Sequence, residues 1–137
     1  MKASDTEKVI LKSMISSFEG ITATKHDAVY AIIWSAESYL YNRMTDLNLE
    51  EVAKAKETTN DLEQLLREAS KKYEKANEGW ERCDKILFSE DTFSQSIWQE
   101  AVDNTDEFLD FSKEVMEKCE SIRQEMLKNI KNSGVKP

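Results

Sequence analysis

The chain has 137 residues, of which 39% are hydrophobic and 34% are charged, and it contains only three glycines and one proline. This length is typical of a single domain, and the hydrophobic share is larger than that of a disordered chain. So few glycines and prolines leave few tight turns, which nearly excludes sandwiches, barrels and βαβ folds. The composition therefore predicts an all-α protein in which residues 1–137 form one domain.

The charge balance limits the kinds of partner. Nineteen basic residues against 27 acidic ones give a formal charge of −8, which is unlike the basic surface that neutralises nucleic-acid phosphates. The longest apolar run, residues 28–34, is far shorter than the about 20 residues that cross a bilayer. The N-terminus also lacks the apolar stretch of a signal peptide. We therefore expect a cytoplasmic protein whose partner is a protein rather than nucleic acid or membrane, and the acidic charge is compatible with a basic partner.

A first helix is predicted directly after the N-terminus. Ser4 and Glu7 have the spacing of a capping box, and apolar residues follow at helical spacing. Gly20 is a natural stop for a helix. The first helix is therefore expected over about 5–19.

A second helix is expected over about 25–46, with Thr24 as its cap. It is apolar on most of its circumference. One face carries Val29, Ile33, Ala36, Leu40 and Met44, and another carries Tyr30, Trp34 and Tyr41. A helix of this kind is either central in a bundle or covered by a partner.

Two longer helices are predicted to follow. Asn48 caps the third, which ends near 88, and Thr92 with Gln95 forms a capping box for the fourth. In both helices apolar or small residues alternate steps of three and four residues, a period typical of helices packed lengthwise. We call these residues the seam: Val52, Ala55, Thr59, Leu62, Leu66, Ala69, Tyr73, Ala76, Trp80, Cys83 and Leu87, then Trp98, Ala101, Thr105, Phe108, Ser112, Val115, Cys119, Ile122 and Met126.

The short break near residue 90 makes the two long helices antiparallel, so the predicted fold is an antiparallel helical bundle built on this hairpin. The first two helices either lie end to end along it, giving a long three-helix bundle, or fold back on each other, giving a four-helix bundle over one half and leaving the other half bare. The sequence leaves both arrangements open. Residues 132–137 are expected to fray.

Few residues are candidates for catalysis. His26 is the only histidine, and at the start of a predicted helix we expect it to be exposed and structural. Cys83 and Cys119 occupy seam positions about 30 Å apart in the hairpin, which is too far for a disulfide. We expect both to be small buried hydrophobes. The sequence assigns no catalytic residue, metal ligand or cofactor.

One acidic pattern suggests an enzyme. Glu78 and Glu81 form E-x-x-E, and Glu100 and Asp103 form E-x-x-D after eighteen intervening residues. Carboxylates three residues apart on two antiparallel helices can converge on a magnesium ion that holds nucleotide phosphates. This spacing resembles that of the all-α, MazG-like nucleotide pyrophosphohydrolases. The resemblance covers these four positions and the hairpin between them, and it implies magnesium-dependent nucleotide hydrolysis as an alternative function.

Two surfaces suggest binding instead. An acidic stripe on the fourth helix, opposite the seam, consists of Asp103, Glu107, Asp110, Glu114 and Glu117. No basic residue between 99 and 112 offsets it, and such like charges are relieved by a basic partner. The aromatic residues Tyr30, Trp34 and Tyr41 are of the types that concentrate in interfaces. Packing inside the protein's own core is the alternative for these rings.

The sequence therefore favours a non-catalytic helical adaptor or inhibitor that binds a protein partner through the aromatic residues and the acidic stripe. The amount of apolar surface favours a homodimer as well. A lipid-associated amphipathic bundle is a further alternative, because long amphipathic helices can bind lipid surfaces.

Overall fold

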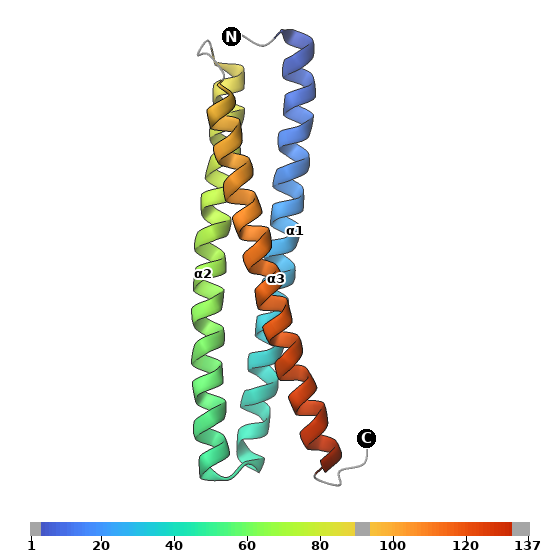
Figure 1. Cartoon of the computed structure of the whole chain (residues 1–137), viewed down its shortest axis with the longest axis vertical. Helices are drawn as coiled ribbons and strands as arrows, with labels where there is room; N and C mark the ends of the chain where they lie inside the picture. Colours follow the sequence, from blue (N-terminus) through green and yellow to red (C-terminus); the bar gives the residue numbers. More distant parts are fainter. Residues whose placement is uncertain (1–3, 90–93, 133–137) are drawn as a thin grey trace.

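The computed structural model describes residues 4–89 and 94–132, and in them it contains three long helices and no strand (Figure 1). The elements are, in chain order, α1 (Asp5–Arg43), the short 3₁₀ turn η1 (Met44–Asp46), α2 (Leu49–Phe88) and α3 (Gln95–Asn132). The predicted all-α class is confirmed.

The main difference from the prediction is α1, which is one continuous helix where two were predicted, over about 5–19 and 25–46. Gly20 lies inside this helix instead of ending it, and Thr24 is an interior residue rather than a cap. A glycine inside a helix costs only about 1 kcal/mol. The buried residues Ile15, Thr22 and Val29 lie seven residues apart on one side of α1. The packing of this side offsets the cost of Gly20, so the helix continues past it.

Side-chain caps begin the helices. The side-chain oxygens of Ser4 and Asn48 accept hydrogen bonds from the backbone N–H three residues later, at 3.2 and 2.9 Å, as predicted for α1 and α2. Ser94 accepts the equivalent bond at the start of α3, at 3.4 Å. The predicted cap Thr92 and the tail residues 133–137 lie outside the described residues.

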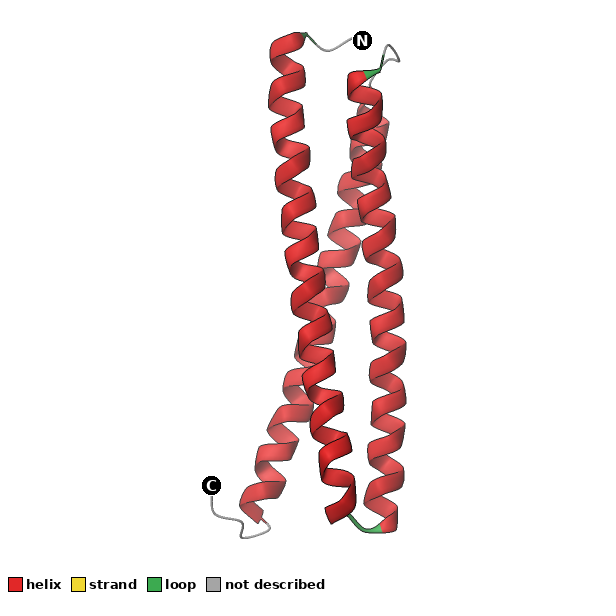
Figure 2. Cartoon of the chain, turned by 180° about the vertical axis from the view of Figure 1, so that it is seen from behind, coloured by secondary structure: helices red, strands yellow, loops and turns green. Residues whose placement is uncertain are grey.

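The three helices lie lengthwise against one another, and each contacts both of the others. α2 runs antiparallel to α1 and to α3, as Figure 1 shows. Towards its C-terminal end α3 diverges from α2, and the second half of α1 lies between α2 and α3. Figure 2 shows the same arrangement from behind.

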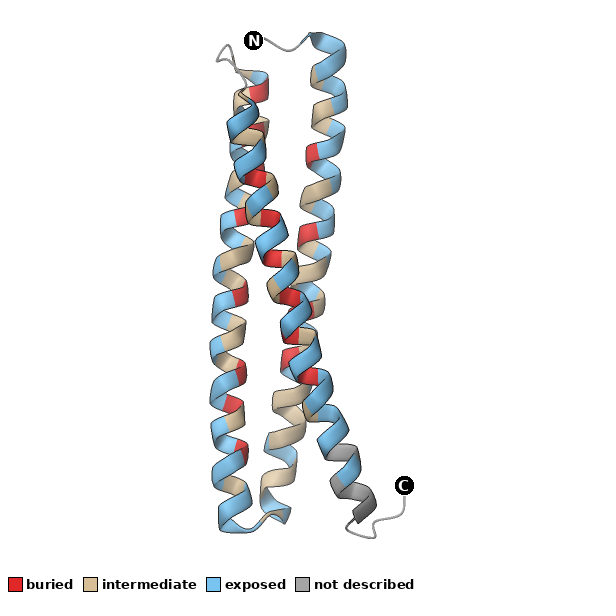
Figure 3. Cartoon of the chain, in the orientation of Figure 1, coloured by how far each residue is buried: buried red, intermediate tan, exposed pale blue. Residues whose placement is uncertain are grey.

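The buried residues of α2 and α3 are the seam residues predicted from the sequence (Figure 3). They are Ala55, Thr59, Leu62, Ala69, Ala76, Trp80, Cys83 and Leu87 in α2, and Ala101, Thr105, Phe108, Ser112, Val115 and Cys119 in α3. The other seam residues whose burial is described are partly buried. The core therefore follows the period that the sequence showed.

Among the described residues, Trp80 lies in one of the two buried clusters in which all three helices meet. Its side chain is fully buried, and its indole N–H donates a 2.7 Å hydrogen bond to Thr105 Oγ1 of α3. Its ring stacks on Phe18 of α1, with centroids 4.8 Å apart, and contacts the ring of Trp98 edge-on at 5.1 Å. The one polar group of the indole is thus paired inside an otherwise apolar contact.

Next to Trp80, Gly79 allows α2 and α3 to approach closely. A Cβ atom at this position would lie 3.1 Å from the backbone Cα of Ala101. The backbone of Ala101 cannot move aside to make room for a Cβ atom, as the end of a flexible side chain could. A glycine facing an alanine therefore sets the distance between the two helices here.

Phe108→Ala is expected to lower the free energy of unfolding by about 3–5 kcal/mol, because it leaves a cavity in the core. Phe108 is fully buried, and its ring packs against that of Tyr73 at 5.7 Å. Asp110→Ala is the matched control on the exposed side of α3 and should change stability by no more than about 0.5 kcal/mol. Denaturant unfolding measures both changes, and equal midpoints for the two variants would contradict the assignment of the seam.

Candidate functional site

The aromatic residues predicted to bind a partner lie on the outside of α1. Tyr30, Trp34 and Tyr41 are 52%, 63% and 53% exposed, respectively. They are spaced four and seven residues apart, so they share one side of the helix. The alternative that these rings pack in the protein's own core is wrong, because Val29 and Ile33 occupy the inward side of α1 and are fully buried.

The outward side of α1 carries further exposed apolar residues along its length. We define the α1 face by its seven large apolar members: Val9, Ile10, Met14, Ile21, Tyr30, Trp34 and Tyr41. Between residues 9 and 42, the exposed residues of α1 include one charged side chain, Asp27. A helix at the surface of a protein normally presents charged residues to water. The α1 face instead has the charge depletion that is typical of an interface core.

The acidic stripe on α3 is exposed, as the sequence indicated; it consists of Asp103, Glu107, Asp110, Glu114 and Glu117. The expectation that its charges are not offset needs correction, because α2 supplies cations. Lys72 Nζ lies 2.8 Å from Glu107 Oε1. This hydrogen bond is the main reason that the pKa of Glu107 is lowered and that of Lys72 is raised. Arg82 also lies 3.8 Å from Glu100, which precedes the stripe.

The four carboxylates of the nucleotide-hydrolase alternative each have surroundings of their own. Glu81 and Asp103 accept hydrogen bonds from side-chain amides of their own helices, at 3.1 and 2.9 Å. Glu100 faces Arg82, and Glu78 is exposed. In the part of the chain that the structure describes, no three His, Cys, Asp or Glu side chains gather closely enough to hold a metal ion.

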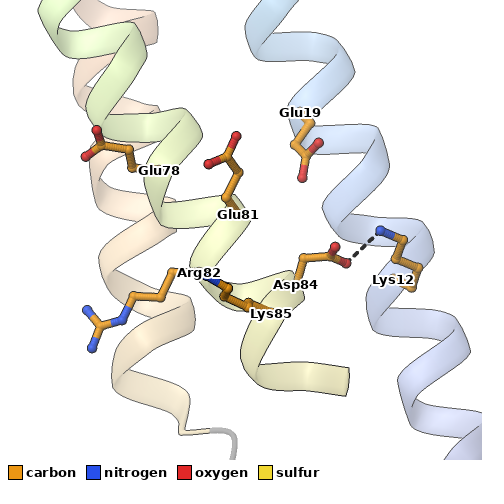
Figure 4. Close-up of a pocket in the computed structure, with 7 residues that line it drawn as sticks. All are labelled: Lys12, Glu19, Glu78, Glu81, Arg82, Asp84 and Lys85. Atoms are coloured by element: carbon orange, nitrogen blue, oxygen red, sulfur yellow. Dashed lines mark hydrogen bonds and ion pairs between the residues drawn. The ribbon is translucent and has the colours of Figure 1, made fainter. Parts of the chain in front are cut away.

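Glu78 and Glu81 belong to a polar groove of about 510 Å³ between α1 and the C-terminal half of α2 (Figure 4). Lys12 of α1 spans this groove, with Nζ 2.6 Å from Asp84 Oδ1 of α2. Glu19 lies beside them, and desolvation, followed by the charge of Asp84, raises its pKa. The one ion pair across the groove joins α1 to α2, so its evident role is to hold these helices together.

His26 is not the exposed residue that the sequence predicted. It lies in the middle of α1, where its ring stacks on that of Tyr73 of α2 with centroids 4.3 Å apart. Its side chain is only 25% exposed, and Nδ1 lies 3.9 Å from Asp27 Oδ1. The prediction failed because it assumed that a helix begins at residue 25. His26 therefore packs between two helices.

The two cysteines are free and buried, as predicted. Burial raises the pKa of the Cys83 thiol to about 11 and also raises that of Cys119. A thiol must ionise to act as a nucleophile. Both side chains therefore behave as small hydrophobic groups near neutral pH.

Glu37 is a feature that the sequence analysis missed. One oxygen of its carboxylate, Oε1, is buried and has no hydrogen-bond partner in the described chain. Desolvation raises the pKa of Glu37, and the charge of Glu63 on α2 raises it further. The available signal was its position as the only charged residue between 28 and 42. This carboxylate opposes the packing of α1 on α2.

Comparison with known proteins adds no relative to these observations: no family model, curated protein or solved structure matches the chain. Within the described residues, none of the three helices combines the length and the apolar character that crossing a bilayer requires. The function must therefore be argued from the surfaces of α1 and α3.

Glu37→Gln is expected to stabilise the protein at neutral pH, because it removes a charge that is partly buried beside Glu63. The sign follows from linkage: a carboxyl whose pKa is raised by folding destabilises the fold when ionised, and this penalty disappears as the pH falls through that pKa. The stability gain should therefore be present at pH 7 and vanish in acid. Thermal unfolding across this range measures it, and a loss of stability at pH 7 would contradict the account.

Proposed function

We propose that this protein is a non-catalytic helical module, an adaptor or an inhibitor, that binds protein partners through the α1 face and the acidic stripe of α3. The observation that carries the proposal is the α1 face. Its seven large apolar residues are 41–70% exposed on a helix whose outward side is almost uncharged. Apolar surface of this extent marks an interaction site.

The aromatic residues are the expected anchors of the interaction. Tyr and Trp are enriched among the few residues that supply most of the binding energy of an interface. Trp34 is the most exposed of the three aromatic residues of the α1 face, and its ring offers the largest area to a partner. We therefore assign Trp34 as the central anchor, with Tyr30 and Tyr41 on either side.

The acidic stripe supports a second contact, with a basic surface. Asp103, Asp110 and Glu114 are exposed and take part in no ion pair within the described residues. Charges at the edge of an interface mainly steer association and suppress wrong partners. The stripe is therefore suited to select a basic partner rather than to supply most of the affinity.

The proposal includes the scaffold, an antiparallel bundle built on the α2–α3 hairpin with α1 laid along it. The seam and the ion pairs Lys72–Glu107 and Lys12–Asp84 hold the helices together. This arrangement presents the α1 face and the acidic stripe on two different helices. The setting we propose is the cytoplasm, where buried free thiols such as those of Cys83 and Cys119 are usual.

Site-specific photo-crosslinking tests the proposal in cells that express the protein. A photoreactive phenylalanine replaces Trp34, Asp110 or, as the control, Lys71, which is exposed on α2. We expect crosslinked protein products from positions 34 and 110 but not from position 71. Excess wild-type protein should compete for the product at position 34, whereas the Trp34→Glu variant should not. Equal yields at all three positions, or equal competition by both proteins, would contradict the proposal.

A further inference from the structure

We propose that the α1 face is covered by the α1 face of a second copy of this chain, packed antiparallel about a two-fold axis near Thr24. The inference rests on the proposed function, because it names the partner of one of its two surfaces. It leaves the acidic stripe of α3 free for a different, basic protein.

The exposed apolar area supplies much of what a dimer needs. Large aromatic side chains bury about 150–250 Å² each, so the half-exposed rings of Tyr30, Trp34 and Tyr41 together offer roughly 300 Å². The exposed aliphatic residues Val9, Ile10, Met14 and Ile21 add a smaller area each. Together they form a large part of the ~800 Å² that each partner buries in a standard interface.

The charge distribution selects this side of the molecule for self-association. Two copies with a formal charge of −8 each repel one another. The exposed positions of α2 and α3 are rich in charged residues, whereas those of α1 between 9 and 42 include only Asp27. Contact through the α1 face therefore brings few like charges together, and Lys25, at the edge of the central depression, is the main exception. It also keeps the acidic stripes away from the interface.

The α1 face is complementary to itself in shape. Its middle is a shallow depression of about 660 Å³ lined mostly by small side chains, among them Ser17, Gly20, Thr24 and Ala28. Larger apolar residues lie on both sides of it along the helix. Two crossing helices are closest at their crossing point and separate towards their ends. The small residues in the middle of the α1 face allow close approach at the crossing point, and the larger residues towards its ends fill the wider gap there.

The ends of α1 favour the antiparallel arrangement. With the axis near Thr24, Trp34 of one copy lies level with the aliphatic Met14 of the other along the helix, and Arg43 lies near Asp5. A parallel arrangement would instead point the two helix dipoles in the same direction, which is unfavourable for neighbouring helices. The antiparallel orientation is therefore favoured because it places opposite charges at the ends of the two α1 helices and aromatic residues level with aliphatic ones.

Sedimentation of the purified protein in the micromolar range tests the dimer. We expect the wild type to be a dimer and Gly20→Leu to be a monomer, because the leucine fills the crossing point. A Cβ at Gly20 meets no atom of the chain within 4 Å, so this variant should keep its helical fold as a monomer. Leu49→Glu is the control, since it removes a residue that is 91% exposed on α2, and it should remain a dimer. A monomeric wild type, or a dimeric Gly20→Leu variant, would overturn the inference.

Disulfide trapping tests the register. Cys83 and Cys119 are buried, so an introduced surface thiol reacts selectively. A symmetric disulfide requires Cα atoms within about 7 Å, which is met only near the axis in an antiparallel pair. Thr24→Cys should therefore form a covalent dimer on mild oxidation, and Ala31→Cys, one heptad further along the exposed side, should not. Equal trapping at both positions would indicate parallel helices, and trapping at neither would contradict the contact.

The two proposals fail in different ways. If the wild type is monomeric while the photoreactive group at position 34 still captures a different protein, the second copy is the wrong partner and the proposed function stands. If the wild type is a dimer and position 110 captures nothing, the dimer stands and the contact with a basic partner is wrong.

Discussion

The buried hydrogen bond from the Trp80 indole to the Thr105 hydroxyl fixes α2 against α3, and the same indole ring is the surface on which the first half of α1 packs. Leaving this N–H unpaired in the core would cost about 1–3 kcal/mol, so the two residues are held opposite each other. The stacking of Phe18 on the same ring sets the rotation of α1 about its axis. Once Phe18 and its neighbour Ile15 face inward, helical geometry directs Ile10 and Trp34 outward. The exposure of the α1 face thus follows from the packing of the opposite side of α1, around Trp80 in its first half and through Val29 and Ile33 in its second half.

This constraint gives the three helices different roles. α2 and α3 bury one side and present charged residues on the other, which is the ordinary pattern of a surface helix. α1 buries one apolar side and exposes a second one, at a cost in solubility that the proposed partner would remove. The exception on α1 is Glu37, a carboxylate placed against α2 where it lacks a hydrogen-bond partner. The three helices therefore form a packed core, but the outward side of α1 remains apolar and exposed to water.

The parts of this structure that the sequence could predict are those in which local pattern and tertiary packing agree. The seam of α2 and α3 repeats every 3.5 residues, and residues such as Leu62 and Phe108 are buried where the period places them. In α1 the stop signal at Gly20 was outweighed by burial of Ile15 and Thr22 on one side of the helix. A helix apolar on two sides does not reveal which side is inward, so the exposure of Trp34 required the structure. Contacts between helices, such as Lys72 with Glu107, leave no periodic signal at all.

The central claim is that the α1 face lies outside the chain's own fold and is covered by a second copy. Fluorine NMR of protein labelled with fluorotryptophan tests it directly, because Trp34 is exposed, Trp80 is fully buried and Trp98 is partly buried. In the Gly20→Leu variant the Trp34 resonance should shift between H₂O and D₂O while that of Trp80 should not. In the wild type the Trp34 shift should become smaller as the protein concentration rises. A Trp34 resonance as insensitive to solvent as that of Trp80 in the monomeric variant would place the aromatic residues in the core and contradict the account.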